Sequence, residues 1–106
     1  MENAAVYYGT RKAGTLRRKE TGYEFIYDPD YLTDPKATPI SLSMPLTRTK
    51  YESARFFPFF DGLLPEGWLL ELTCSAARID KKDKFNLLLH TGGDPVGAVS
   101  VLRLED

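Results

Sequence analysis

The sequence has few of the side chains that most protein chemistry requires. Its 106 residues include one cysteine, Cys74, and one histidine, His90, which lie well apart in the chain. A structural zinc site brings about four cysteine or histidine ligands together, so no such site is predicted and no cofactor is implied. A single cysteine cannot close an intramolecular disulfide, which is typical of a reducing compartment, and we expect a cytoplasmic location.

Strong net charge and long apolar runs are also missing. The chain has 14 lysines and arginines against 15 acidic residues, a net charge of −1, so no general attraction to nucleic-acid phosphates is expected. It has no run of about 18 apolar residues, the length that crosses a bilayer, and no basic segment leading into an apolar one at its N-terminus. Direct nucleic-acid binding, membrane insertion and secretion are therefore disfavoured.

The chain does contain enough apolar material for a core. Hydrophobic residues make up 42% of it and aromatic residues 12%, which is unlike the composition of disordered segments. A chain of this length forms about one domain, so we predict a single domain over residues 1–106. No internal repeat or low-complexity tract divides the sequence.

The first part of the chain shows the alternation and turn residues of an antiparallel meander. Strands are predicted at residues 4–8, 13–19 and 23–27, separated by turns that contain glycine. Aromatic residues occupy alternate positions of the third strand and therefore line one face of the sheet. These residues are Tyr23, Phe25 and Tyr27.

A turn and a fourth strand are predicted next. Residues 28–30, Asp-Pro-Asp, favour a turn because proline cannot donate to a strand ladder. In residues 39–46, apolar and serine side chains alternate between two prolines, which predicts a short, half-buried strand. Its apolar face is expected to carry Ile40, Leu42 and Met44.

In the middle of the chain, apolar residues recur every three or four positions, as one face of a helix requires. A first short helix is predicted around residues 56–63, with Pro58 tolerated in its first turn. A second is predicted to begin with Pro65 at its first position and to continue to about Ala77. Glu66 is then expected near the positive end of the helix dipole.

A third helix is predicted between Asp80, as its N-cap, and a stop at Gly92 and Gly93. His90 is expected to complement the dipole at the end of this helix rather than to act in catalysis. Residues 96–102 are rich in β-branched side chains and predict a closing strand. The predicted class is α+β, a small antiparallel sheet of about five strands with about three short helices inserted before the last strand.

Two polar segments allow more than one interpretation. Residues 92–97, Gly-Gly-Asp-Pro-Val-Gly, have the glycines of a phosphate-binding loop, but they lack Gly-Lys-Ser/Thr and precede a strand. We interpret them as a helix stop and a tight turn. The first hairpin is expected to gather a basic cluster, either a solvated, edge-protecting face or a contact for an acidic partner or DNA phosphates. The cluster comprises Arg11, Lys12, Arg17, Arg18 and Lys19.

Two motifs carry a family resemblance. Residues 59–68 read Phe-Phe-Asp-Gly-Leu-Leu-Pro-Glu-Gly-Trp, and residues 92–99 read Gly-Gly-Asp-Pro-Val-Gly-Ala-Val. Together with the opening hairpin, residues 39–46 and the closing strand, they resemble the N-terminal module of HipA-type toxin kinases. The resemblance covers most of the chain, and Leu-Leu-Pro-Glu-Gly and Gly-Gly-Asp-x-x-Gly-Ala are its more specific elements. The catalytic part of such kinases does not follow within the 106 residues.

A module of this kind on its own is similar to HipS, the small antitoxin of three-part HipBST toxin–antitoxin systems. The resemblance implies a binding protein without catalysis that neutralises a separate HipT-like serine/threonine kinase toxin. It also implies a ternary complex with a HipB-like protein, which carries the DNA-binding helix-turn-helix. Two alternatives stay open: an excised N-terminal regulatory module of a full-length HipA-like kinase, and a DNA-associated accessory subunit acting with a HipB-like repressor.

The turn before the second predicted helix is the expected partner-binding site. Tryptophan is unfavourable in water and has few torsions to freeze, so beside a glycine at a helix start it makes a good interface anchor. From spacing alone, Trp68 fits equally well on a face with Leu72 that packs in the core, and the resemblance is what favours contact with a kinase. The expected binding residues are Leu64, Pro65, Glu66, Gly67 and Trp68.

An enzymatic alternative rests on Asp61, Glu66 or Asp94 as a general acid or base. These carboxylates have no histidine, lysine or metal-ligand companion at a recognisable spacing, so catalysis is not predicted. Nucleotide binding or ATP hydrolysis by the chain alone would support this alternative.

Overall fold

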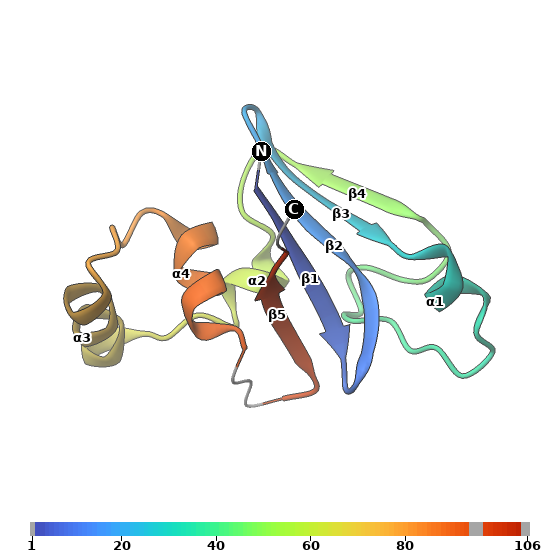
Figure 1. Ribbon diagram of the computed structural model, residues 1–106. Coiled ribbons are helices and arrows are strands. Elements are labelled where there is room, and N and C mark those ends of the chain that lie inside the picture. The colour runs from blue at the N-terminus through green and yellow to red at the C-terminus, as the bar shows by residue number, and fades with distance from the viewer. Residues whose placement is uncertain (1, 94–96, 105–106) are drawn as a thin grey trace.

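The computed structural model of the protein describes residues 2–93 and 97–104. Within these residues lies one antiparallel sheet of five strands in the spatial order β4-β3-β2-β1-β5, so the last strand returns to pair with the first (Figure 1). The first three strands form the predicted meander. The strands span Glu2–Tyr8 (β1), Arg11–Lys19 (β2), Gly22–Tyr27 (β3), Lys50–Ser53 (β4) and Val99–Arg103 (β5).

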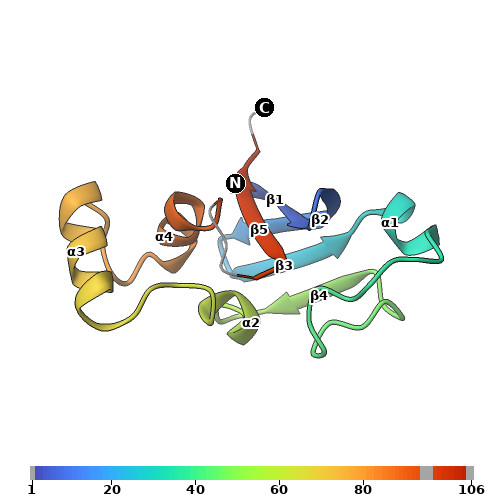
Figure 2. The ribbon, with the colours of Figure 1, turned by 90° about the horizontal axis from the view of Figure 1, so that it is seen from below.

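Four helices accompany the sheet in the described part of the chain, one more than the sequence predicts. Helices α2 and α4 supply residues to the core, and α3 lies beyond them at one end of the molecule (Figures 1 and 2). Helix α1 lies at the opposite end, before the long loop that leads to β4. The α+β class is as predicted. The helices span Pro29–Thr33 (α1), Pro58–Asp61 (α2), Gly67–Ala77 (α3) and Lys84–Thr91 (α4).

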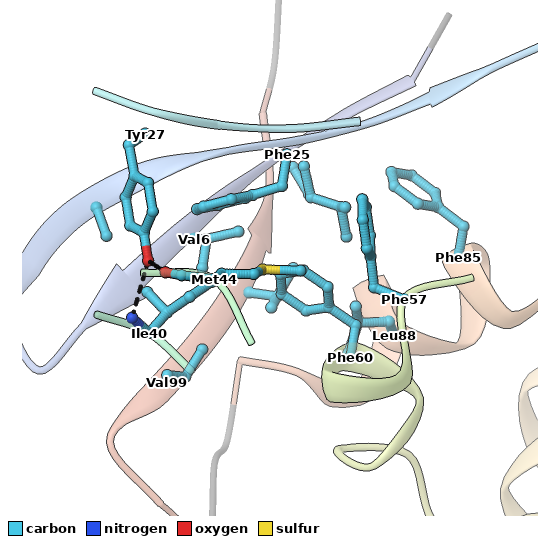
Figure 3. Close-up of a cluster of buried hydrophobic side chains, with 14 of the residues drawn as sticks. Val6, Phe25, Tyr27, Ile40, Met44, Phe57, Phe60, Phe85, Leu88 and Val99 are labelled. Atoms are coloured by element: carbon cyan, nitrogen blue, oxygen red, sulfur yellow. Dashed lines mark hydrogen bonds between the residues drawn. The ribbon is translucent and has the colours of Figure 1, made fainter. Parts of the chain in front are cut away.

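One face of the sheet forms the hydrophobic core. Ala4, Leu16 and Phe25 lie side by side on neighbouring strands, and all three are fully buried. Phe25 also packs edge-on against Tyr27, with ring centroids 4.8 Å apart, so alternate aromatic residues of β3 share one face as predicted. The helices and the loop before β4 complete the core with Ile40, Met44, Phe57, Phe60, Phe85 and Leu88 (Figure 3).

The prediction of a strand over residues 39–46 is wrong. Ile40 and Met44 are buried, but Leu42 between them is 99% exposed, so the three residues do not share a face. The segment forms bends and a turn instead of a strand. The hydroxyl of Tyr27 donates to the carbonyl oxygen of Met44 and accepts the N–H of Ile40 (3.1 Å), so it takes the place of a strand ladder (Figure 3). The fourth strand lies further along the chain, at β4.

Two helix starts differ from the prediction. Pro29 occupies the start of α1, where its missing N–H and fixed φ are tolerated, so the segment predicted as a turn begins a helix. Helix α3 begins at Gly67, with Glu66 as its N-cap, and not at Pro65. Pro65 therefore belongs to the linker between α2 and α3. Pro58 does lie in the first turn of α2, as predicted.

Helix α4 is capped by Asp83 and not by the predicted Asp80. The carboxylate of Asp83 accepts the N–H of Asn86 at 3.1 Å, which is the bond that an N-cap makes. Asp80 accepts the N–H of Lys82 (2.9 Å) in the turn before the helix. The N-cap of α4 therefore lies three residues after the predicted one.

Helix α4 ends at Gly92 because there is no room for a side chain there, and the backbone of Gly92 is not left-handed. Gly92 has φ −75°, and a Cβ there would lie 2.7 Å from the carbonyl oxygen of Leu88 and 3.0 Å from the Cβ of Val101. Its carbonyl oxygen accepts the N–H of Val101 at 2.9 Å, which ties the end of α4 to β5. Glycine permits this close approach. The rest of the predicted turn, residues 94–96 with Asp94, lies outside the described residues.

Candidate functional site

The predicted partner-binding turn connects α2 to α3 and is only partly covered. Leu64 and Pro65 are half-buried, and Leu64 packs against the edge of the core, whereas Glu66, Gly67 and Trp68 are exposed. Gly67 has φ +59°, in the left-handed region that favours glycine, and nothing lies within 4 Å of a Cβ placed there. The backbone conformation alone explains this glycine, and it sets the direction in which α3 leaves the body of the protein.

Helix α3 carries an apolar stripe that faces solvent. Trp68 is 76% exposed, Leu72 57% and Leu69 47%. Trp68 and Leu72 are four positions apart and are neighbours on one helix face. Trp68 is therefore not a core residue in this structure. Leu69 and Leu72 are not among the predicted binding residues, because a stripe at helical spacing is equally typical of a buried face.

The other side of α3 faces the body of the protein and is thinly covered. Leu70, Thr73 and Ala77 are half-buried, and Cys74 is the one buried residue of this helix. A helix that is apolar on more than one face is normally buried on those faces. Helix α3 lies instead at the outer end of the molecule (Figures 1 and 2). The stripe of Trp68 is exposed to solvent. Contiguous exposed apolar patches on proteins commonly mark sites of protein or membrane contact.

Two hollows flank the linker between α2 and α3. The larger, of about 360 Å³, is mostly apolar and lies between the linker, α3, the end of α4 and β5. The smaller, of about 260 Å³, lies toward the start of α4. Leu64 and Pro65 line both, so the linker forms the ridge between them. Other residues that line the larger hollow are Leu63, Leu69, Thr73 and Val99.

Charged pairs border the smaller hollow and α3. Lys84 pairs with Asp61 at 2.9 Å, and Lys81 pairs with Glu71 at 2.5 Å. The hydrogen bond to Glu71 raises the pKa of Lys81, which keeps this side chain cationic. Exposed pairs of this kind add little to stability. An apolar centre with a charged rim is, however, the usual arrangement of a protein–protein interface.

The basic cluster predicted on the first hairpin does not form. Arg11 and Lys12 lie at one end of β2 and residues 17–19 at the other, about 20 Å away at the rise of a strand. Each of the five cations is paired with a carboxylate. The pairs are Arg11–Asp34, Lys12–Asp28, Arg17–Glu24, Arg18–Asp83 and Lys19–Glu52.

Arg18 ties the sheet to α4. Its guanidinium pairs with Asp83 at 2.6 Å and with Glu2, and it lies 5.2 Å from the ring centroid of Phe85. The cation is therefore held between two carboxylates over an aromatic ring. This position makes Arg18 a structural contact and leaves it poorly placed for phosphates.

The carboxylates considered for catalysis are in ordinary surroundings. Asp61 and Glu66 both line the smaller hollow, but Asp61 is an exposed partner of Lys84, and Asp94 lies outside the described residues. Catalytic acids and bases typically sit in a cleft that excludes water, whereas Asp61 and Glu66 are both exposed. Within residues 2–93 and 97–104, no group of three or more His, Cys, Asp and Glu side chains is placed to hold a metal ion.

The one histidine of the chain, His90, is exposed in the last turn of α4, which is the helix end predicted for it. Among the helices described, none is both long enough and apolar enough to cross a membrane.

The fold and this surface define a class of protein: an α+β module that presents an open apolar helix beside a five-stranded antiparallel sheet. The family model of the HipA N-terminal domain matches residues 4–102, and the chain belongs to this family. A solved structure, the N-terminal domain of HipA toxin, matches with a TM-score of 0.78 and 32% identity, over 100% of this chain and 95% of that one. The resemblance found in the sequence is confirmed.

Two relatives differ in length. An uncharacterised protein of Haemophilus influenzae is 40% identical over 88 residues, which cover 83% of this chain and 79% of that protein. The putative kinase Y4mE of Sinorhizobium fredii is 35% identical over 98 residues, which cover 92% of this chain but 23% of the kinase. Both the family model and the solved structure are of the N-terminal domain of HipA, so the comparisons assign this chain to that domain.

Proposed function

We propose that this chain is a HipS-like antitoxin, which binds and neutralises a separate HipA- or HipT-like serine/threonine kinase toxin by protein–protein contact. The observation that carries the proposal is the open stripe of α3, with Trp68 76% exposed at the start of the helix. The relative Y4mE supports it, because there a region like this chain is joined to a longer putative kinase. In the proposed complex, the module and the kinase meet as two chains.

Burial of the stripe supplies the binding free energy in this proposal. Trp68, Leu69 and Leu72 are large apolar side chains, and complete burial of one such side chain contributes about 1.5–3 kcal/mol. The helix already fixes their positions, so little backbone freedom is lost on binding. The charged pairs beside them form a rim that favours one orientation of the partner.

Two modes of inhibition are compatible with such a contact. In the first, Trp68 and its turn enter or border the active-site cleft of the kinase. In the second, the module restrains the kinase lobes from outside the cleft. A non-hydrolysable ATP analogue separates them, because a module that fills the cleft excludes the analogue, whereas a module that restrains the lobes from outside can be bound together with it.

The test is calorimetric titration of a HipA-type kinase, taken from the adjacent reading frame where that frame encodes one, with the wild-type module and with Trp68→Ala. A hot-spot residue contributes at least about 2 kcal/mol, so Trp68→Ala should weaken binding by roughly 30-fold and relieve the inhibition of kinase activity. Leu102→Ala is the matched control, because Leu102 is 45% exposed in β5, away from α3. Wild-type protein that does not bind the kinase, or Trp68→Ala that binds and inhibits equally well, would refute the proposal.

A second candidate is the N-terminal regulatory module of a longer HipA-like kinase, and the 23% share of Y4mE that matches this chain favours it. The adjacent reading frame distinguishes the two. A separate kinase gene supports the antitoxin, and an in-frame continuation beyond residue 106 supports the fused module.

A HipB-like DNA-binding protein completes the proposed assembly as the third subunit. The cations of β2 are paired with carboxylates, which supports leaving DNA contact to that partner. An accessory subunit that itself associates with DNA is the alternative. Specific, steeply salt-dependent DNA binding by the isolated chain would favour that alternative.

A further inference from the structure

Leu42 is an apolar side chain held in open solvent. It is 99% exposed, whereas Ile40 and Met44 on either side of it are 4% and 3% exposed. Single leucines on a protein surface are common, so exposure alone indicates little. Leu42 differs from an ordinary surface leucine because a fixed turn carries it.

Tyrosine hydroxyls fix this turn from inside the protein. Tyr27 donates to the carbonyl oxygen of Met44 and accepts the N–H of Ile40 at 3.1 Å (Figure 3). Tyr51 donates to the carbonyl oxygen of Pro45 at 2.6 Å. These bonds and the buried side chains of Ile40 and Met44 hold both ends of the turn against the sheet.

Short hydrogen bonds also close the backbone around Leu42. The N–H of Met44 donates to the carbonyl oxygen of Ser41 at 3.1 Å, and the N–H of Ser43 donates to the Oγ of Ser41 at 3.2 Å. The two serine hydroxyls lie 2.9 Å apart. An apolar side chain on such a fixed backbone loses little freedom when a partner covers it, which is the property of an interface anchor.

The turn lies on the same side of the molecule as the start of α3. In Figure 2, the loop between α1 and β4, helix α2 and the first turn of α3 all lie along the lower edge. Ile40 and Met44 lie in the core, and Leu42 between them is an exposed apolar side chain of this loop. The longest dimension of the protein is 42 Å, so one partner can reach both ends of this surface.

We propose that Leu42 is a second anchor for the kinase, and that it enters an apolar pocket of leucine size on that protein. The inference rests on the proposed function and extends its contact surface from α3 across α2. The kinase is the chosen occupant because, in the relative Y4mE, a region like this chain makes up 23% of a putative kinase, so module and kinase belong to one molecule there. A second copy of this chain is the competing occupant.

The test compares Leu42→Ser with wild-type protein in titrations of the same HipA-type kinase that tests the proposed function. The substitution removes an apolar side chain that packs on nothing, so the melting temperature should not change. Affinity should fall by roughly tenfold or more, and Leu42→Met should retain most of it. Leu102→Ser, at another exposed leucine, is the matched control and should bind like wild type.

The outcomes separate this inference from the proposed function. If Trp68→Ala weakens binding and Leu42→Ser does not, the inference is wrong and the proposed function stands. If wild-type protein does not bind the kinase, both are wrong. A photo-cross-linking residue at position 42 gives a direct readout: a cross-link to the kinase supports the inference, and a cross-link only to a second copy, or none, overturns it.

Discussion

The hydroxyl of Tyr27 donates a hydrogen bond to the carbonyl oxygen of Met44 and so joins the end of β3 to the loop before β4. The same hydroxyl accepts the N–H of Ile40 at 3.1 Å, and all three residues are buried. Because water does not reach these backbone groups, the tyrosine is their partner. One side chain of the sheet therefore holds the irregular segment that carries Leu42.

Tyr27→Phe should lower the free energy of unfolding by about 1–3 kcal/mol, because it leaves a buried carbonyl oxygen and a buried N–H without a partner. The measurement is urea unfolding followed by circular dichroism. Tyr51→Phe is the matched control. Its bond to the carbonyl oxygen of Pro45 is exposed, so water can replace the hydroxyl and the loss should be smaller. Equal losses in the two variants would contradict this account.

Tyr27 should also make the protein sensitive to alkaline pH. Burial of the hydroxyl raises the pKa of Tyr27, and Tyr51 and Tyr31 nearby add to the shift. An unfolded tyrosine ionises at about pH 10, so the stabilising contribution of Tyr27 is complete below that pH and is lost as the pH rises toward its folded pKa. The free energy of unfolding should therefore fall above about pH 10, and less steeply in Tyr27→Phe. Identical slopes in the two proteins would contradict the prediction.

Asp83 should contribute more to stability than Asp80. Asp83→Ala removes the N-cap of α4 and the ion pair with Arg18 at 2.6 Å, and should lower the free energy of unfolding by about 1–2 kcal/mol. Asp80→Ala removes an exposed bond to the N–H of Lys82 and should change it by less than about 0.5 kcal/mol. Thermal and urea unfolding of both variants provide the comparison, and a larger loss in Asp80→Ala would show that the cap is misassigned.

The strands of the meander were predictable because their signal is local. Alternation places Phe25 and Tyr27 on one face whatever else the chain does. Alternation failed at Ile40, Leu42 and Met44, because the hydroxyls of Tyr27 on β3 and Tyr51 on β4 satisfy the backbone there. The true fourth strand, Lys50–Ser53, has polar residues on an edge and so has little apolar pattern to detect.

The candidate site was predictable in its position but not in its extent. The turn of Pro65 and Gly67 is visible in the sequence, since proline and glycine punctuate helices. Whether Trp68 and Leu72 face the core or solvent depends on what packs against α3, which no local pattern contains. The cations of β2 show the same limit, because the carboxylate partners of Arg11, Arg18 and Lys19 come from distant parts of the chain.

Of the two longer helices, α3 and α4, helix α3 should be the less protected from hydrogen exchange in the free protein. Cys74 is its one buried residue, whereas α4 buries Phe85, Leu87 and Leu88, so α3 opens more easily. Amides in α3 should exchange with deuterium roughly tenfold or more faster than those of α4, a factor that corresponds to about 1.4 kcal/mol. Adding the kinase should slow exchange in α3, with α4 as the internal reference. Equal protection of the two helices in the free protein would contradict the packing argument, and unchanged exchange in α3 in the complex would exclude α3 from the interface.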